Sequence, residues 1–168
     1  MLIKSKVYFV ALCVGFVGFE ILLYKLDPFC IAETYMDDLL ETIKNGDQQA
    51  LCDLFSQEAQ NEDKIVNNAK LLLKLFGNDF RASNYNRGMA KKSACYGEIY
   101  QEAYTGCDIE TSNGTYRVMI KVCIKDTSNT ENIGIVSLYI TRIESLEGAG
   151  YWGAYTAWEP GIILRINN

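Results

Sequence analysis

The stretch CDIETSNGTYRVMIKVCIKD, residues 107–126, predicts a β-hairpin with one apolar face. Asn113-Gly114 is the strongest short hairpin signal in the chain, because both central residues of a type I′ turn need a positive φ. If these two residues form the loop, Ile109 faces Val118, and apolar side chains continue on that face in both directions.

The same register places opposite charges opposite each other on the second face of the hairpin. Glu110 meets Arg117, and Glu102 meets Lys125. Each such pair contributes about 0.2–1 kcal/mol. A slip by one residue would turn the charges toward the buried face, so we expect the register to be strongly specified.

The segment IGIVSLYITRIE, residues 133–144, is expected to pair with the hairpin as a third strand. Val136 opposite Val122 and Leu138 opposite Ile120 would extend the apolar face, which is typical of an antiparallel sheet with one side buried. The predicted inward face consists of Ala103, Thr105, Cys107, Ile109, Val118, Ile120, Val122, Ile124, Val136, Leu138 and Ile140.

Amphipathic segments precede these strands. Residues 33–45 repeat apolar side chains at helical spacing, and Gly46 is expected to end the helix. Asp47 is predicted to cap a second, shorter helix, and Asn61 a third that ends at Gly77.

Strand patterns follow the helices. Residues 80–85 predict a short strand, and residues 91–111 a long one with a bend or bulge at Gly97 or Gly106. Residues 147–161 form a glycine-aromatic loop before a short last strand. Helices followed by a meander predict the α+β class, with N-terminal helices packed on one side of an antiparallel sheet.

Residues 1–30 predict a targeting segment, followed by one domain over residues 31–168. Lys4 and Lys6 precede an apolar run from Val7 to Tyr24, and a membrane-spanning helix needs roughly 17–25 residues. The positive flank favours an uncleaved anchor, with the following domain on the extracytoplasmic side of the cell membrane.

Three other interpretations of this segment stay open. Residues 30–32 offer a weak cleavage site for a signal peptide. Cys30 follows the apolar run, as a lipid-modified cysteine would, although the preceding residues fit that motif poorly. The segment could also be a buried helix of the core.

Composition excludes several classes of function. A net charge of −5 and the lack of a Lys/Arg-rich run argue against nucleic-acid binding. The chain has no histidine, and its six cysteines show no CxxC spacing, so we predict no metal site, no cofactor and separate, reduced cysteines.

Residues 45–60, NGDQQALCDLFSQEAQ, resemble the helix-turn-helix entry of the nuclear-transport-factor-2-like (cystatin-like) superfamily. Residues 116–142, YRVMIKVCIKDTSNTENIGIVSLYITR, look like a Firmicutes family of exported or anchored domains of unknown function. The resemblance covers roughly residues 33–166. It implies a curved sheet wrapped around helices, with a cone-shaped cavity, and it implies no activity because the superfamily hosts enzymes and non-enzymes alike.

Enzymes of that superfamily place carboxylates or histidines inside the cone, whereas the predicted inward face here carries no carboxylate. We therefore assign no catalytic residue. The inward polar groups and the aromatic loop form a candidate ligand pocket, made of Thr105, Tyr116, Arg142, Trp152 and Trp158. The aromatic loop could equally plug the open end of the core or lie at a membrane surface.

The outer sheet face offers a candidate surface for a homodimer or a protein partner, since Tyr, Met and Arg are enriched in interface cores. Its centre would be Tyr104, Met119, Cys123 and Tyr139. The leading hypothesis is a membrane-tethered, non-catalytic module that binds a small apolar ligand or a protein. The alternatives are a small enzyme with a rim carboxylate such as Asp108, and an immunity or inhibitor-type protein whose acidic surface meets a basic partner.

Overall fold

A computed structural model describes residues 27–146 and 159–165 of the chain. The helices come first, in the order α2 (Pro28–Asn45), α3 (Gln48–Asp53), α4 (Gln57–Gln60) and α5 (Ile65–Phe76). The strands follow as β1 (Arg81–Cys95), β2 (Glu98–Thr111), β3 (Gly114–Asp126), β4 (Gly134–Arg142) and β5 (Gly161–Arg165). Two short 3₁₀ turns, η1 (Thr130–Asn132) and η2 (Ile143–Leu146), flank β4.

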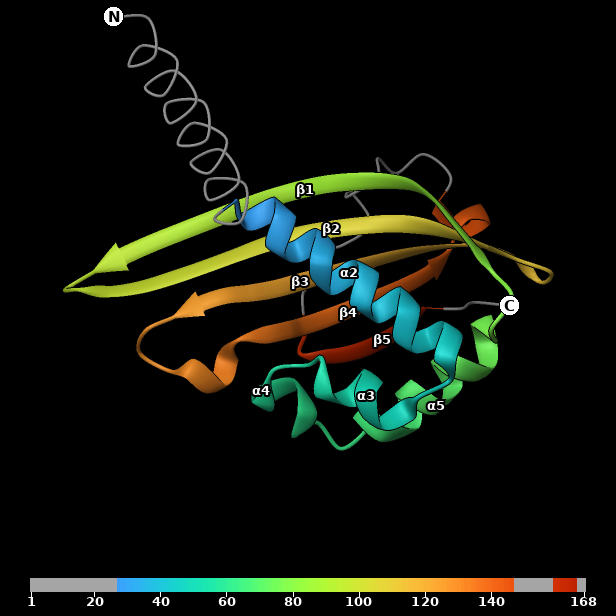
Figure 1. The fold of residues 1–168 in the computed structure, drawn as a ribbon, viewed down its shortest axis with the longest axis horizontal. Helices are drawn as coiled ribbons and strands as arrows, with labels where there is room; N and C mark the ends of the chain where they lie inside the picture. Colours follow the sequence, from blue (N-terminus) through green and yellow to red (C-terminus); the bar gives the residue numbers. More distant parts are fainter. Residues whose placement is uncertain (1–26, 147–158, 166–168) are drawn as a thin grey trace, which may run out of the picture.

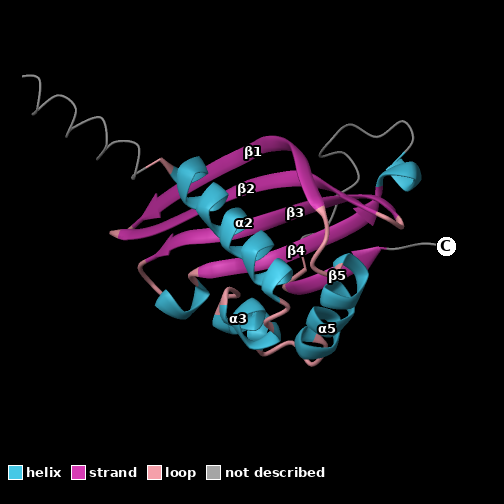
Figure 2. Ribbon diagram, turned by 45° about the vertical axis from the view of Figure 1, so that its right-hand side comes forward, coloured by secondary structure: helices cyan, strands magenta, loops and turns pink. Residues whose placement is uncertain are grey.

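The strands form one five-stranded sheet in the order β1-β2-β3-β4-β5. The first four strands are antiparallel neighbours, and β5 joins the edge parallel to β4. The sheet is curved, and α2 lies diagonally across one face while α3, α4 and α5 lie toward the β4–β5 side (Figures 1 and 2). The predicted α+β class, with N-terminal helices on one side of a curved, mainly antiparallel sheet, is confirmed.

Helix α2 starts earlier than the predicted residue 33. Asp27 caps it by accepting a hydrogen bond from the Phe29 amide at 2.9 Å, and Pro28 occupies the first turn. Proline is favoured there because the first amides of a helix have no intrahelical acceptor. Gly46 ends the helix with φ 67°, as predicted.

The two shorter helical segments fit the prediction in part. Asp47 caps α3 by accepting a hydrogen bond from the Ala50 amide at 3.0 Å, as expected. The prediction that Asn61 caps the third helix is wrong. Asn61 ends α4, and α5 begins at Ile65 without a side-chain cap.

The register of the β2–β3 hairpin differs from the prediction by two residues. Thr111 pairs with Gly114, so the loop residues are Ser112 and Asn113, and Gly114 alone carries the positive φ, 132°. Ile109 therefore faces Tyr116 rather than Val118. A shift of two residues keeps every side chain on its original face, which is why the buried face was predicted correctly despite the wrong register.

The predicted charge pairs do not form. Arg117 lies opposite Asp108 instead of Glu110 and makes an ion pair with it at 3.0 Å. The same two-residue shift places Glu102 opposite Cys123 rather than Lys125.

The predicted bend at Gly97 is a tight turn between two strands. Tyr96 (φ 49°) and Gly97 (φ 87°) link β1 to β2, and two positive φ values in a two-residue loop are the mark of a type I′ turn. Gly106, the alternative position for a bend, pairs regularly with Met119 inside the sheet. The predicted short strand at residues 80–85 continues through two register shifts and becomes the first part of β1.

The core lies between α2, α5 and the facing side of the sheet. Ile120 pairs with Leu138 as predicted, but a bulge pairs Val122 with Ile135, which takes the core position expected for Val136. The sheet contributes Ala103, Cys107, Ile109, Tyr116, Val118, Ile120, Val122, Ile135, Leu138, Ile140 and Ile162.

A short backbone connection joins the helical layer to the sheet. The Ser56 amide donates to the Ile135 carbonyl at 2.9 Å, and the Ile135 amide donates to the Leu54 carbonyl at 3.0 Å. Gly134, at φ 128°, begins β4 directly beneath this connection. The segment between α3 and α4 is thus held against the first residues of β4.

Candidate functional site

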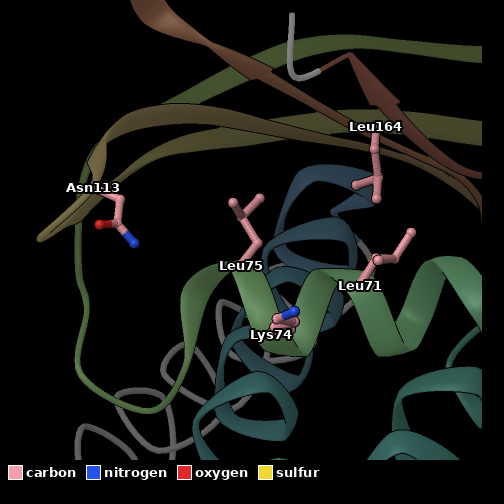
Figure 3. Close-up of a pocket in the computed structure, with 5 residues that line it drawn as sticks. All are labelled: Leu71, Lys74, Leu75, Asn113 and Leu164. Carbon is pink, nitrogen blue, oxygen red and sulfur yellow. The ribbon is translucent and has the colours of Figure 1, made fainter. Parts of the chain in front are cut away.

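An open groove of about 410 Å³ lies between α5, β5 and the tip of the β2–β3 hairpin (Figure 3). It is lined by Leu71, Lys74, Leu75, Asn113 and Leu164. Three of these five side chains are leucines, so most of the lining is apolar.

The groove arises because α5 carries more leucines than its core face can bury. Ala69, Leu72 and Phe76 face the core and are buried. Leu71 and Leu75, one helical turn apart, lie beside that stripe and face β5 across the groove. Leu71 is 54% exposed. The sequence shows both leucines within a predicted helix, but it does not show where β5 lies.

Positive charge lies at the groove. Lys74 has no ion pair within the described ranges of the chain. The Arg142 guanidinium donates a hydrogen bond to the Asn113 carbonyl and lies over the Tyr116 ring at 5.8 Å. A cation and an apolar wall therefore face the same open space.

The structure brings together only part of the predicted ligand pocket. Tyr116 and Arg142 are cross-strand neighbours, and the Tyr116 ring packs edge-on against Phe76 at 5.6 Å. Thr105 lies farther along β2, buried, with its hydroxyl donating to the Asn86 carbonyl at 3.3 Å. The other two pocket residues, Trp152 and Trp158, lie outside the described residues.

The four side chains predicted as an exposed partner surface are buried. Tyr104 is 5% exposed, Tyr139 1%, and Met119 and Cys123 are fully buried. Met119 and Tyr139 pair across β3 and β4, and Cys123 lies opposite Glu102. The expected exposure of this surface is wrong, and a partner role for these residues stays a prediction.

Glu102 is the centre of a buried polar cluster on that outer face. The hydroxyls of Tyr100 and Tyr104 donate to its carboxylate at 2.8 and 2.7 Å, and the Lys121 ammonium lies 3.0 Å away. Burial alone would raise the pKa of Glu102, but the hydrogen bonds from Tyr104, Lys121 and Tyr100 outweigh it and lower the pKa. This carboxylate is therefore a stable anion with its acceptor positions occupied.

The pKa values of the two tyrosines shift in the opposite direction to that of Glu102. Burial and the hydrogen bond to Glu102 raise the pKa of both Tyr100 and Tyr104 well above the usual value. Both hydroxyls therefore stay protonated at neutral pH and can donate to the carboxylate.

Asp108, the candidate rim carboxylate, is buried and engaged. Arg117 pairs with it at 3.0 Å, and the Asn84 side chain donates to it at 3.0 Å. It does not line the groove between α5 and β5. The structure thus separates Asp108 from that cavity.

Among the described residues, no group of three or more His, Cys, Asp or Glu side chains is arranged to hold a metal ion. No helix within residues 27–146 and 159–165 is long and apolar enough to cross a bilayer. The apolar run of the predicted anchor, Val7 to Tyr24, lies outside these ranges, whereas residues 28–30 of the predicted targeting segment form the first turn of α2.

Asp126 organises the turn after β3 and makes a pH-dependent contribution to stability. Its carboxylate accepts hydrogen bonds from the Ser128 hydroxyl at 2.7 Å, the Asn132 side chain at 2.9 Å and the Asn129 amide at 3.0 Å. These donors, led by Ser128 and Asn132, lower the pKa of Asp126 to about 2.

Because the pKa of Asp126 is lower in the folded state, its contribution to the free energy of unfolding is fully present above the unfolded pKa of about 3.9. The contribution is lost as the pH falls toward 2. We expect Asp126→Asn to flatten the pH dependence of stability in that window, measured as the urea midpoint at each pH. Glu131→Gln, an exposed change in the same loop, is the control. Equal slopes in wild type and Asp126→Asn would contradict the assignment.

No curated protein and no solved structure matches the chain. Residues 38–144, from within α2 to η2, match the model of a domain of unknown function, DUF5104. This match covers well over half of the chain and includes the sheet as far as β4. The chain therefore belongs to the DUF5104 family.

Proposed function

We propose that the domain is a non-catalytic binding module whose groove between α5 and β5 takes a small apolar molecule with an anionic group. One observation carries this proposal. Leu71, Leu75 and Leu164 line an open groove beside Lys74, which has no ion pair in the described part of the chain.

The physical case rests on size and on exposed apolar area. The groove volume of about 410 Å³ falls within the range of about 300–1,000 Å³ that is usual for small-molecule sites. Covering apolar surface contributes about 25 cal/mol per Å², so a ligand over Leu71 gains from area that folding leaves in water. Lys74 would meet the anionic group at the rim.

The interior of the fold offers the alternative place for an apolar ligand. The side chains predicted to line a cone, such as Cys107 and Ile109, are fully buried and packed. Met36 of α2 approaches Cys107 to 3.9 Å between the two sulfur atoms. These contacts favour the groove over the interior as the binding site.

The proposal includes attachment to the outer side of the cell membrane through the predicted targeting segment, residues 1–30, with its apolar run from Val7 to Tyr24. Its support is the sequence, in which two lysines precede a long apolar run. Membership of the nuclear-transport-factor-2-like superfamily, with its cone-shaped sheet, and a Firmicutes origin belong to the same proposal. Helices packed on one face of a curved sheet support that fold relationship.

Photo-crosslinking tests the groove directly. The full chain, reconstituted in lipid nanodiscs, is labelled with a water-soluble, diazirine-bearing short-chain fatty acid, and the labelled peptides are mapped by mass spectrometry. We expect labelling within α5 and β5. Leu71→Ser should lower it about tenfold, which corresponds to about 1.4 kcal/mol of lost affinity.

Matched controls lie on the same helix. Val66 is also 54% exposed but lies outside the groove, so Val66→Ser should leave labelling unchanged. Lys74→Glu should reduce labelling by the fatty acid but not by the corresponding neutral amide, whereas Lys70→Glu should affect neither. The proposal would be rejected if no labelled peptide came from α5. It would also be rejected if Val66→Ser reduced labelling as strongly as Leu71→Ser.

A further inference from the structure

Two lysines share one face at the end of the sheet where β1 turns into β2. Lys92 lies opposite Gln101, and Gln101 lies opposite Lys125, so the three side chains form a row across β1, β2 and β3. Cross-strand neighbours point to the same side of a sheet. Within the described residues neither lysine makes an ion pair, although the protein as a whole is acidic.

An exposed aromatic residue projects from the same end. Tyr96 is 103% exposed and adopts φ 49° in the type I′ turn. Glycine, asparagine and aspartate dominate such positions, and a bulky side chain there is strained. Because the Tyr96 side chain is fully exposed, no burial within the domain offsets the strain of its backbone. This favours a role for the side chain in a contact outside the chain.

Two carboxylates at this end are engaged. Glu102 is held by Lys121 and two tyrosines, and Asp126 is held by the donors of its own turn. Glu98 beside the turn and Glu131 in the loop after β3 are exposed. Lys92 and Lys125, by contrast, have no carboxylate opposite them in the row across the strands.

The β1–β2 turn lies on the side of the domain at which α2 begins (Figure 1). The first turns of α2 contact β1 at Arg87, which pairs with Glu33 at 2.6 Å and lies over the Phe29 ring at 5.8 Å. From there β1 runs on to Cys95, roughly 25 Å farther at about 3.3 Å per residue. The β1–β2 turn thus projects beyond the start of α2 (Figures 1 and 2), and the first described residue, Asp27, is the N-cap of that helix.

We infer that Lys92, Lys125 and Tyr96 form a membrane-contact patch that rests on an anionic lipid surface. Lysine side chains reach phosphate groups while their stems cover apolar surface, and tyrosine is enriched at the level of lipid headgroups. An anionic leaflet attracts each lysine side chain that lies near its surface. The inference rests on the proposed attachment through residues 1–30, because that segment would hold this end of the sheet close to the bilayer.

Protection of an edge strand does not explain all three residues. Charged side chains on an edge strand prevent it from pairing with another sheet, which would account for Lys92 on β1. Lys125 lies two residues beyond the last pair of β3 with β4, so edge protection accounts for it as well. It does not account for Tyr96, which is aromatic and lies in the turn. An acidic peptide along β1 is less well matched, because Arg87 and Lys91 already pair with Glu33 and Glu102.

Cys95 provides a reporter beside the patch, because it is exposed, whereas Cys30, Cys107 and Cys123 are buried. The full chain, with Cys13→Ser and Cys52→Ser, is spin-labelled at Cys95 and reconstituted in phosphatidylcholine vesicles with or without phosphatidylglycerol. Collisions of the label with oxygen report lipid, and collisions with a water-soluble nickel chelate report water. We expect phosphatidylglycerol to raise the frequency of collisions with oxygen and to lower the frequency of collisions with the nickel chelate.

Charge and aromatic variants identify the contacting residues. Lys92→Glu with Lys125→Glu should abolish the difference between the two lipid compositions, whereas Lys64→Glu with Lys70→Glu, at the α5 end, should retain it. Tyr96→Asn should reduce the collisions with oxygen while relieving the strain in the turn, so loss of folding cannot explain its effect.

The outcomes separate this inference from the attachment on which it rests. A chain that floats with the vesicles but keeps a water-exposed label in both compositions overturns the patch and leaves the attachment standing. A chain that does not float overturns both. A label that is immobilised by soluble polyglutamate but not by phosphatidylglycerol overturns the lipid contact in favour of an acidic protein partner.

Discussion

Replacing Gly134 with alanine is expected to destabilise the domain by about 3 kcal/mol, from two causes that act together. Gly134 has φ 128°, a conformation that residues with a side chain rarely adopt. A Cβ there would lie 2.9 Å from the Ser56 nitrogen and 3.1 Å from the Leu54 oxygen. Both atoms belong to the backbone connection between the α3–α4 segment and β4, so neither can move without breaking hydrogen bonds.

The matched control for this prediction is Gly46→Ala. Gly46 also has a positive φ, 67°, but an added Cβ would find no atom within 4 Å. It therefore measures the backbone cost alone, about 1 kcal/mol. Urea denaturation of the two variants, read at the midpoint, gives the difference that is due to the contact with residues 54–56. Equal destabilisation by Gly134→Ala and Gly46→Ala would show that the connection tolerates displacement.

Removing the carboxylate of Glu102 is expected to have a comparable or larger effect. Glu102→Ala leaves Lys121 without its partner at 3.0 Å and leaves the Tyr100 and Tyr104 hydroxyls without their acceptor. Breaking one partner of a buried ion pair typically costs about 3–5 kcal/mol, since the remaining charge stays buried and uncompensated. Thermal or urea unfolding of the variant at neutral pH measures this loss.

Two conservative variants separate the contributions of charge and of hydrogen bonding to the destabilisation caused by Glu102→Ala. Glu102→Gln keeps the shape and one carbonyl acceptor but loses the negative charge, so it should destabilise less than Glu102→Ala. Tyr104→Phe removes one donor, a hydrogen bond to a charged group worth about 1.5–3 kcal/mol. The opposite result, a stable Glu102→Ala variant, would mean that water or another group replaces the carboxylate.

The pH dependence of wild-type stability gives an independent check on Glu102. The lowered pKa means that its contribution is present above the unfolded pKa and is lost as the pH falls through the folded value. In Glu102→Gln that part of the acid dependence should vanish. Asp126 titrates in the same direction, so the two carboxylates must be compared in separate variants.

Periodicity predicted the element types and the buried faces, because these depend on the alternation of side chains. The apolar positions of α2 are an example: Met36, Leu39, Leu40 and Ile43 are all buried as expected. In the hairpin the alternation also gave the correct face for Ile109 and Val118. The partner across the ladder was nevertheless wrong, since a two-residue shift leaves the alternation unchanged.

Turn chemistry was the weak point of the prediction. Asn113-Gly114 has the preferred sequence for a type I′ turn, yet only Gly114 takes a positive φ there. The two positive φ values occur instead at Tyr96-Gly97, where tyrosine gives no such signal. The conformation at residue 96 is imposed by the long pairing of β1 with β2, and local preference could not reveal it.

The candidate site depended on information that is not local. Leu71 and Leu75 were visible as leucines within a predicted helix, but their groove exists only because β5 returns parallel to β4 and brings Leu164 opposite α5. The outer sheet face was predicted to be exposed, whereas its residues Tyr104, Met119, Cys123, Tyr139 and Glu102 are buried. A pattern of alternating polar residues does not distinguish these two situations.

The connection between residues 54–56 and the start of β4 also bears on how the chain folds as it is made. The helices emerge first, with apolar faces that have no sheet to cover them, while each hairpin from β1 to β4 closes between chain neighbours. Local pairing has a small loop-closure cost, so the meander can assemble quickly once it is available. Docking of the α3–α4 segment must wait until Gly134 and Ile135 have been synthesised. A nascent chain interrupted before β4 would therefore leave the apolar side chains of this segment uncovered, which defines the interval in which it depends on chaperones.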